Sequence, residues 1–241
     1  MFSACILHML DLAAQETVPT PSTKPVDSNS AMKEVAPGIF DLNGVRLDKI
    51  NQQISFPGVI NQREGLVEYL LVGEKGKTHE SLIRTIIQPR DIHLALLLIG
   101  LKENPKPNQS QPLPPSTIDS AYLKSTPPLK GTPVRVFVSW KLGGKQRQVP
   151  AEDWINNLQT GHPMTHGDWT YNGSMIENGV FLADQELSII SVITDPTALI
   201  NNSRPGHDND EIWEARTGVI PPLDTPLELM IVLTDFQPKK K

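Results

Sequence analysis

Alternating segments that flank turn dipeptides are the feature that most restricts what this chain can fold into. Residues 134–149, VRVFVSWKLGGKQRQV, alternate valines with other residues and then reach the Gly143-Gly144 pair. Residues 38–49, GIFDLNGVRLDK, have the same form around Asn43-Gly44. Period-two alternation is typical of strands with one buried face, and both dipeptides favour two-residue hairpin turns. The pattern therefore predicts antiparallel hairpins.

Two segments interrupt this strand pattern with helix signals. Residues 89–100, PRDIHLALLLIG, begin with a proline and a carboxylate and stay apolar until Gly100, which predicts a helix buried on all sides. Residues 150–161 begin with Pro-Ala-Glu-Asp and space Trp154 and Leu158 four apart, which predicts a second, short helix. We therefore expect an α+β domain, a largely antiparallel β-sheet with two short-to-medium helices and long loops.

The apolar N-terminus and the polar stretch after it favour an exported, periplasmic or envelope-associated protein. Residues 1–14 form a short apolar segment, and residues 15–33 are rich in Pro, Ser and Thr. This order resembles the end of a signal peptide, although no Lys or Arg precedes the apolar part. The alternative is a cytoplasmic protein with a poorly ordered N-terminus. A bilayer span takes about 18 or more apolar residues, so we expect no transmembrane span.

Composition defines the expected organisation and excludes several functions. A signal-like segment occupies 1–14, a disordered tether 15–33, a single folded domain 34–238, and a basic tail 239–241. The net charge is −5 and the cationic residues are scattered through the domain, so we expect no nucleic-acid partner. Cys5 is the only cysteine, which excludes disulfides, thiolate catalysis and cysteine-bound metals from the domain.

His79 and Glu80, which precede the apolar run containing His93, are the first candidates for a reactive site. If residues 78–86 form a strand, the side chains of His79 and Glu80 point to opposite faces. A zinc-protease helix would need a histidine three residues after Glu80, where Ile83 stands. The helix dipole and burial both oppose protonation of His93 in the first turn of its predicted helix. We expect Glu80 and His93 to form a buried, hydrogen-bonded structural pair.

Other histidines support an alternative, a metal site. His162 and His166 are four residues apart and Asp168 could add a third ligand, but Pro163 and Gly167 favour a loop over a helix. Metal binding would then depend on side chains that the fold gathers from separate segments. The candidate ligands are His79, Glu80, His93, His162 and His166. We expect no resident cofactor, and a divalent metal is the alternative.

Five short segments spread along the domain form a recognisable set: GLVEYLLV, GKTHESLI, PRDIHLALLLIG, NGSMIENGVFLAD and VIPPLDTPLELMIV. Together they resemble the YdjY domain family of bacterial proteins, and the resemblance extends over residues 35–236. This family is functionally uncharacterised, so the resemblance implies an exported or envelope protein and supplies no reaction. Some relatives carry a ferredoxin-like label, but this domain has no cysteine to bind an iron–sulfur cluster.

Two classes of function remain. The sequence has no glycine-rich nucleotide loop and no nucleophile elbow, so we expect a non-enzymatic module that presents a surface or pocket to an unknown envelope protein or ligand. The alternative is a metal-binding protein or a metal-dependent enzyme that uses clustered His and Glu side chains. The second class requires at least three of the candidate side chains to surround one open position.

Overall fold

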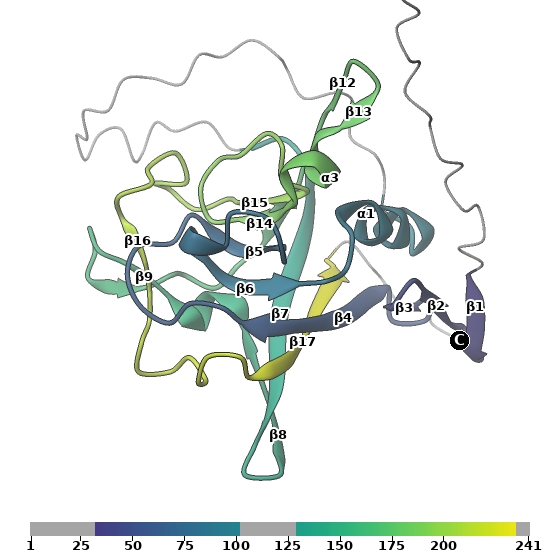
Figure 1. The fold of residues 1–241 in the computed structure, drawn as a ribbon, viewed down its shortest axis with the longest axis horizontal. Helices are drawn as coiled ribbons and strands as arrows, with labels where there is room; N and C mark the ends of the chain where they lie inside the picture. The colour runs from purple at the N-terminus through teal and green to yellow at the C-terminus, as the bar shows by residue number, and fades with distance from the viewer. Residues whose placement is uncertain (1–31, 102–128, 235–241) are drawn as a thin grey trace, which may run out of the picture. The chain divides into compact units, whose positions relative to one another are not determined.

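Strands joined into a closed ring dominate the computed structural model, which describes residues 32–101 and 129–234 (Figure 1). The structure is 44% strand and 12% helical, and eight strands close into a barrel. The strands of this sheet are β1 (Lys33–Ala36), β2 (Ile39–Leu42), β3 (Val45–Asp48), β4 (Gln53–Ile60), β5 (Tyr69–Gly73), β6 (Ser81–Thr85), β7 (Thr132–Leu142), β8 (Lys145–Pro150), β11 (Trp169–Tyr171), β14 (Ser188–Ser191), β15 (Ile200–Asn202) and β17 (Pro226–Leu233).

The ring closes at β4, whose two ends have different neighbours. Its order is β4, β17, β7, β11, β15, β14, β5 and β6, after which β6 pairs with β4 again. Val59 and Ile60 at the end of β4 pair with Arg84 and Ile83 of β6, while the start of β4 pairs with β3. Neighbouring strands are antiparallel except in the pairs β14–β15 and β5–β6. Strands β1, β2, β3 and β8 extend the sheet outside the ring.

Strict alternation on the long strands places the core inside the ring. Leu229 and Ile231 of β17 pair with Val138 and Val136 of β7, and all four side chains are buried. Glu228, the residue before Leu229, is exposed on the outer face. Because successive side chains of a strand point to opposite faces, the alternation read from the sequence determines which face becomes core.

The predicted helix over residues 89–100 forms as α1 (Pro89–Leu98), with its proline in the first turn. Ile92, Ala95 and Leu96 are buried where α1 contacts β3 and β4. Leu94 is 44% exposed and Leu98 is also exposed, so the expectation of a helix buried on all sides is wrong. In the described ranges, no helix is long and apolar enough to cross a membrane.

The expectation of an α+β domain with two short-to-medium helices is also wrong, because in the described part α1 is the one helix of seven or more residues. The helix predicted for residues 150–161 is a single 3₁₀ turn followed by a strand. The proline and carboxylates there start a turn, but Ile155–Asn157 pairs with strands on both sides. The remaining elements are η1 (Thr78–Glu80), η2 (Ala151–Trp154), β9 (Ile155–Asn157), β10 (His162–Pro163), β12 (Ile176–Glu177), β13 (Val180–Phe181), α3 (Leu182–Glu186) and β16 (Trp213–Ala215).

Both predicted hairpins form. β2 and β3 join through Asn43 and Gly44, whose φ angles are 51° and 87°, and β7 and β8 join through Gly143 and Gly144, at 57° and 78°. Two successive positive φ values are what a type I′ turn requires, and its twist matches that of the strands it connects. The local turn chemistry of the sequence was therefore sufficient to predict these two connections.

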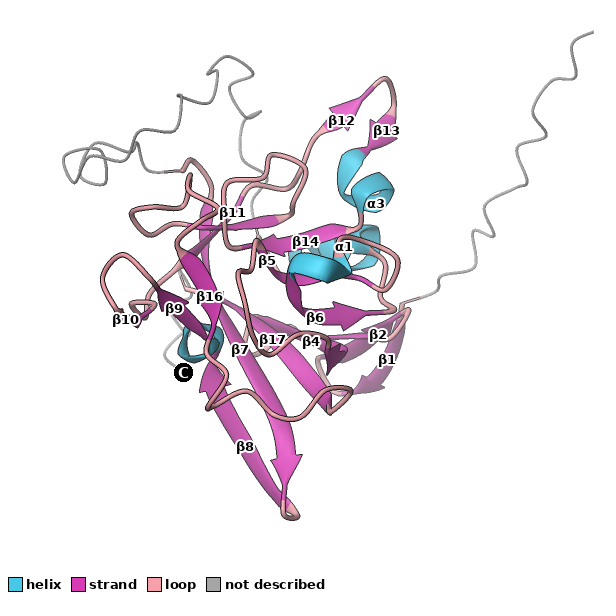
Figure 2. Ribbon diagram, turned by 60° about the vertical axis from the view of Figure 1, so that its left-hand side comes forward, coloured by secondary structure: helices cyan, strands magenta, loops and turns pink. Residues whose placement is uncertain are grey.

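One of these hairpins projects from the barrel. β17 accompanies β7 as far as Trp140, whereas β7 and β8 stay paired to their turn. Residues 141–148 are all exposed, and we call them the β7–β8 arm. Figures 1 and 2 show the arm extending beyond the other strands of the sheet.

Candidate functional site

The five candidate metal ligands are distributed over four parts of the fold. His79 and Glu80 are in η1, His93 is in α1, His162 is in β10, and His166 is in the loop before β11. His79 and Glu80 do meet, with 3.4 Å between Nε2 and Oε2, because residues 78–80 form a 3₁₀ turn and not the predicted strand. In residues 32–101 and 129–234, no group of three or more His, Cys, Asp or Glu side chains is arranged to hold a metal ion.

His93 and Glu80 contact different partners. The hydroxyl of Tyr171, in β11, lies 2.5 Å from Nδ1 of His93, and the ring of Phe181 lies 5.1 Å from the imidazole between centroids. The carboxylate of Glu80 contacts His79, as described above, and both Glu80 and His93 are half-buried. His93 therefore joins α1 to β11 and to the β12–β13 hairpin, which is a contact between structural elements.

A cluster of charged groups surrounds η1. Burial raises the pKa of Glu68, and the nearby carboxylates of Glu80 and Asp210 raise it further, while Lys77 and His79 oppose them. The Lys77 ammonium donates to the Tyr69 hydroxyl at 2.7 Å. This arrangement brings residues 77–80 close to the segment after β15 that carries Asp210, a proximity that the sequence did not reveal.

Within this cluster, Tyr69 has a structural role. Its hydroxyl donates to Oδ2 of Asp195 at 2.9 Å, and Thr197 donates to the other oxygen of that carboxylate. Burial, and then the charge of Asp195, raise the pKa of Tyr69 far above its ordinary range. The phenol therefore stays protonated at any physiological pH and cannot serve as a general base.

A buried ion pair lies at the base of the β7–β8 arm. Glu152, two residues after β8, contacts the Arg204 guanidinium, and their side chains are only 2% and 10% exposed. Arg204 also donates to the backbone carbonyls of Thr165 and Gly167 and lies over the ring of Trp169. Burial lowers the pKa of Arg204, and the carboxylate of Glu152 opposes that effect. The pair ties the end of the arm to two loops.

The same loops contain two of the predicted ligands. Nε2 of His166 lies 2.8 Å from a carboxylate oxygen of Asp153, and Asp168 accepts a hydrogen bond from Arg135 at 2.8 Å. His162 is exposed in β10. The predicted trio of His162, His166 and Asp168 is therefore divided among different contacts, and two of its three members form surface ion pairs.

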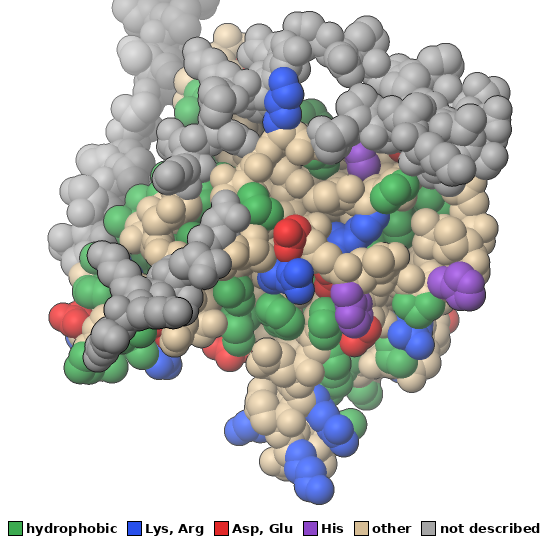
Figure 3. Space-filling view, turned by 180° about the vertical axis from the view of Figure 1, so that it is seen from behind, with side chains coloured by type: hydrophobic (Ala, Val, Ile, Leu, Met, Phe, Trp, Pro, Cys, Tyr) green, Lys and Arg blue, Asp and Glu red, His purple; other side chains and the backbone are tan. Residues whose placement is uncertain are grey.

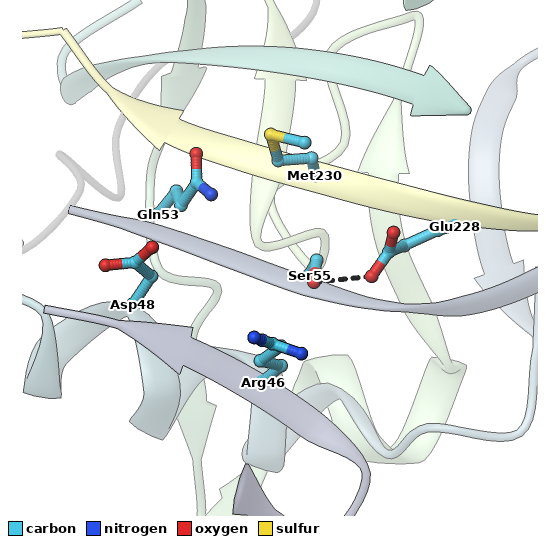
Figure 4. A pocket seen from close by; sticks show the side chains of 6 residues that line it. All are labelled: Arg46, Asp48, Gln53, Ser55, Glu228 and Met230. Atoms are coloured by element: carbon cyan, nitrogen blue, oxygen red, sulfur yellow. Dashed lines mark hydrogen bonds between the residues drawn. The ribbon is translucent and has the colours of Figure 1, made fainter. Parts of the chain in front are cut away.

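A small polar pocket lies on the outer face of β3, β4 and β17 (Figure 4). It has a volume of about 230 Å³, and Ser55 lies at its centre and donates to Glu228 at 2.7 Å. Asp48 is occupied in shaping the following turn, because its carboxylate accepts from the backbone of Ile50 and Asn51. The side chains that line the pocket are Arg46, Asp48, Gln53, Ser55, Glu228 and Met230.

Positive charge gathers on the β7–β8 arm. Figure 3 shows Lys and Arg side chains gathered on the projecting end, without Asp or Glu among them. Residues 141–148 contain Lys141, Lys145 and Arg147 and no carboxylate. None of the three cations forms an ion pair with any described residue. Leu142, beside the turn, is 55% exposed.

The sequence predicted scattered cations and no cationic site at residues 141–148. A hairpin folds both of its strands into one short projection, so residues up to six positions apart come to share it. The available signal was the predicted Gly143-Gly144 turn together with a stretch of eight residues that has three cations and no acid.

Comparison with known proteins supports the resemblance drawn from the sequence. A family model described as the YdjY domain matches residues 45–232, which is most of the chain. No curated protein and no solved structure matches the chain.

Proposed function

The chain belongs to the YdjY domain family, and from that premise we propose that it is a non-enzymatic binding module of the bacterial cell envelope. Two features support the proposal. Residues 1–14 resemble the end of an export signal. The β7–β8 arm, the observation that carries the proposal, presents exposed cations that contribute no described ion pair to the fold.

The base of the arm is fixed, which suits a binding element. Trp140 at the end of the barrel part of β7 packs against Trp154 of η2, with 5.4 Å between ring centroids. The buried Glu152–Arg204 pair holds the chain directly after β8. A rigid base with an exposed tip reduces the conformational entropy that binding would otherwise cost. The arm therefore presents its side chains in a nearly preformed arrangement.

Ser174 and Ser81, the two serines with flanking residues that could suggest a nucleophile, make structural contacts instead. Ser174 donates to the carbonyl of Thr197 and accepts from the amide of Ala183. Ser81 donates to the carbonyl of Lys77. Nucleophilic catalysis by a serine needs an adjacent base, and neither hydroxyl has a hydrogen bond to a described imidazole or carboxylate. These contacts favour a binding role over a hydrolytic one.

The arm should contact a cellular component directly, which photo-crosslinking in the native bacterium can test. A photoreactive amino acid replaces Gln146 of the full chain, and Lys75, an exposed lysine outside the arm, is replaced in the control. An adduct formed from position 146 and not from position 75 is expected. The proposal fails if neither position forms an adduct or if both form the same ones.

A second measurement tests the non-enzymatic part. Elemental analysis of chain purified without chelator should find no stoichiometric transition metal. A metal that disappears in His79→Ala or His166→Ala would overturn the proposal in favour of the metal-dependent alternative. Cell fractionation tests the envelope location, which requires the chain to appear outside the cytosol.

A further inference from the structure

We propose that the β7–β8 arm binds an anionic lipid surface, with Lys141, Lys145 and Arg147 among the headgroups and Leu142 inserted at its tip. This inference rests on the proposed function, because it names the partner of the same arm. It makes the chain a peripheral membrane protein that is attached through a β-hairpin.

The charge of the arm is opposite to that of most of the chain. The full sequence has a net charge of −5, whereas residues 141–148 carry three cations and no acid. An anionic surface would therefore attract the arm and repel much of the rest, which orients the molecule with its arm toward the surface. Each Lys or Arg close to an anionic membrane strengthens binding roughly fivefold. Three of them together strengthen binding roughly 100-fold, and salt weakens this effect.

The tip is suited to shallow insertion. Leu142 is 55% exposed and adjoins the Gly143-Gly144 turn, and both glycines have open space around the position of a Cβ. The arm continues past Trp140 by two residues of β7 and the turn, a reach of roughly 10 Å at 3.3 Å per residue. An apolar residue on a narrow projection, flanked by long cationic side chains, can enter the interface while the charges stay among the headgroups.

The distribution of the cations favours a lipid surface over a docked protein. Lys145 and Arg147 are two residues apart on β8 and share one face of the ribbon with Leu142, which pairs with Lys145. Lys141, one residue before Leu142, lies on the other face. A protein docked against one face or one edge of the hairpin would contact only some of these three cations and Leu142. An anionic surface that surrounds the tip contacts all of it.

A second copy of the chain is a poor partner for the free edge of β8. Antiparallel pairing of two β8 strands would place Lys145 and Arg147 beside the same residues of the other copy, and like charges on adjacent strands are destabilising. Cationic residues on an edge strand also protect it against such pairing. The charge pattern therefore disfavours this self-association of the arm and favours an anionic surface as its partner.

The same edge limits how deeply the arm can enter. In a hairpin closed by a two-residue turn, the flanking pair Leu142–Lys145 is hydrogen-bonded, so the amide and carbonyl groups of Gln146 and Gln148 point away from β7. Unpaired backbone groups do not enter the hydrocarbon region of a bilayer. Insertion should stop at the tip, with Gln146 and Gln148 at the level of the headgroups or in water.

Vesicle co-sedimentation of the full chain tests the proposal. Vesicles of phosphatidylglycerol in phosphatidylcholine should bind it more tightly than phosphatidylcholine alone. Combined substitution of Lys141→Gln, Lys145→Gln and Arg147→Gln should weaken that binding by roughly 100-fold, at about fivefold per cation. The matched control, Lys33→Gln, Lys75→Gln and Lys130→Gln, changes the net charge equally at exposed positions outside the arm and should leave binding unchanged. Equal loss in both variants, or no preference for phosphatidylglycerol, overturns the proposal.

Depth is tested with an environment-sensitive dye. The chain has one cysteine, so Cys5→Ser combined with Leu142→Cys or Gln148→Cys gives a single attachment site. A blue shift on anionic vesicles is expected at position 142 and not at position 148. Equal shifts, or none at position 142, contradict tip insertion.

Failure of the lipid assignment is distinguishable from failure of the proposed function. If vesicles do not bind but position 146 forms a protein adduct in cells, the lipid assignment is wrong and the binding module stands. If position 146 forms no adduct and vesicles do not bind, both proposals are wrong. Circular dichroism of each variant shows that a lost interaction is not a lost fold.

Discussion

Removing the carboxylate of Glu152 should destabilise the fold strongly, because it leaves the Arg204 guanidinium buried without a counter-ion. Loss of one partner of a buried ion pair costs roughly 3–5 kcal/mol. Arg204 keeps neutral hydrogen-bond acceptors at Thr165, Gly167 and Asn202. We therefore expect Glu152→Gln to lower the free energy of unfolding by about 3 kcal/mol, the lower end of that range. For a chain of this size that corresponds to a decrease in melting temperature of roughly 6–12 °C.

Urea unfolding followed by circular dichroism measures this change, and two further variants test its cause. Asp153→Asn removes a carboxylate from the exposed pair with His166 and should cost no more than about 1 kcal/mol. Arg204→Met combined with Glu152→Gln should cost less than the sum of the two single changes, because neither charge is then stranded. A loss below about 1 kcal/mol for Glu152→Gln, or strict additivity in the double variant, would refute the assignment of a tightly coupled pair.

Three further changes test other parts of the structure. Tyr69→Phe should lower the free energy of unfolding by about 1–3 kcal/mol in urea titrations, because Asp195 loses a hydrogen-bond donor while nearly buried. Glu68→Gln should stabilise the fold slightly near pH 7 and not below pH 4.5. The reason is that a carboxyl group whose pKa is raised in the folded state destabilises the fold only at a pH where it is ionised. Equal shifts of the melting temperature at both pH values would contradict this prediction. Gly131→Ala should lower the free energy of unfolding by about 2–3 kcal/mol, and with it the melting temperature, because the added Cβ would lie 2.4 Å from the backbone oxygen of Tyr171. An unchanged melting temperature would show that Gly131 and Tyr171 are not tightly packed.

Local chemistry made the hairpins and α1 readable from the sequence. The Asn43-Gly44 and Gly143-Gly144 turns need nothing beyond the residues themselves and the alternation beside them. The start of α1 at Pro89 is equally local. Family membership was also predicted from the sequence, and the YdjY family model matches residues 45–232.

The misread elements depended on contacts between distant segments. Residues 155–157 became a strand because β10 and β16 pair with them, although the preceding residues favour a helix start. Pairing across the ring cannot be read from periodicity, so the closure of β6 onto β4 was not foreseen. The exposed side of α1 also could not be predicted, because a helix that is apolar on every side does not indicate which side other elements will cover.

The candidate site divides in the same way. The cations of the β7–β8 arm were present in the sequence, but their joint projection depends on β17 ending its pairing at Trp140 while β7 and β8 continue. Glu152 and Arg204 are 52 residues apart, and only the fold makes them a pair. The predicted histidine ligands shared a residue type but not a location.

The sequence by itself therefore determined the hairpins, the first helix and the family, because turn conformation and alternation act over a few neighbouring residues. Tertiary structure alone decided the closed ring, the buried ion pair and the projecting cationic arm. These features arise from strand pairing and burial between segments far apart in the chain, whose free energy depends on positions that no local pattern records.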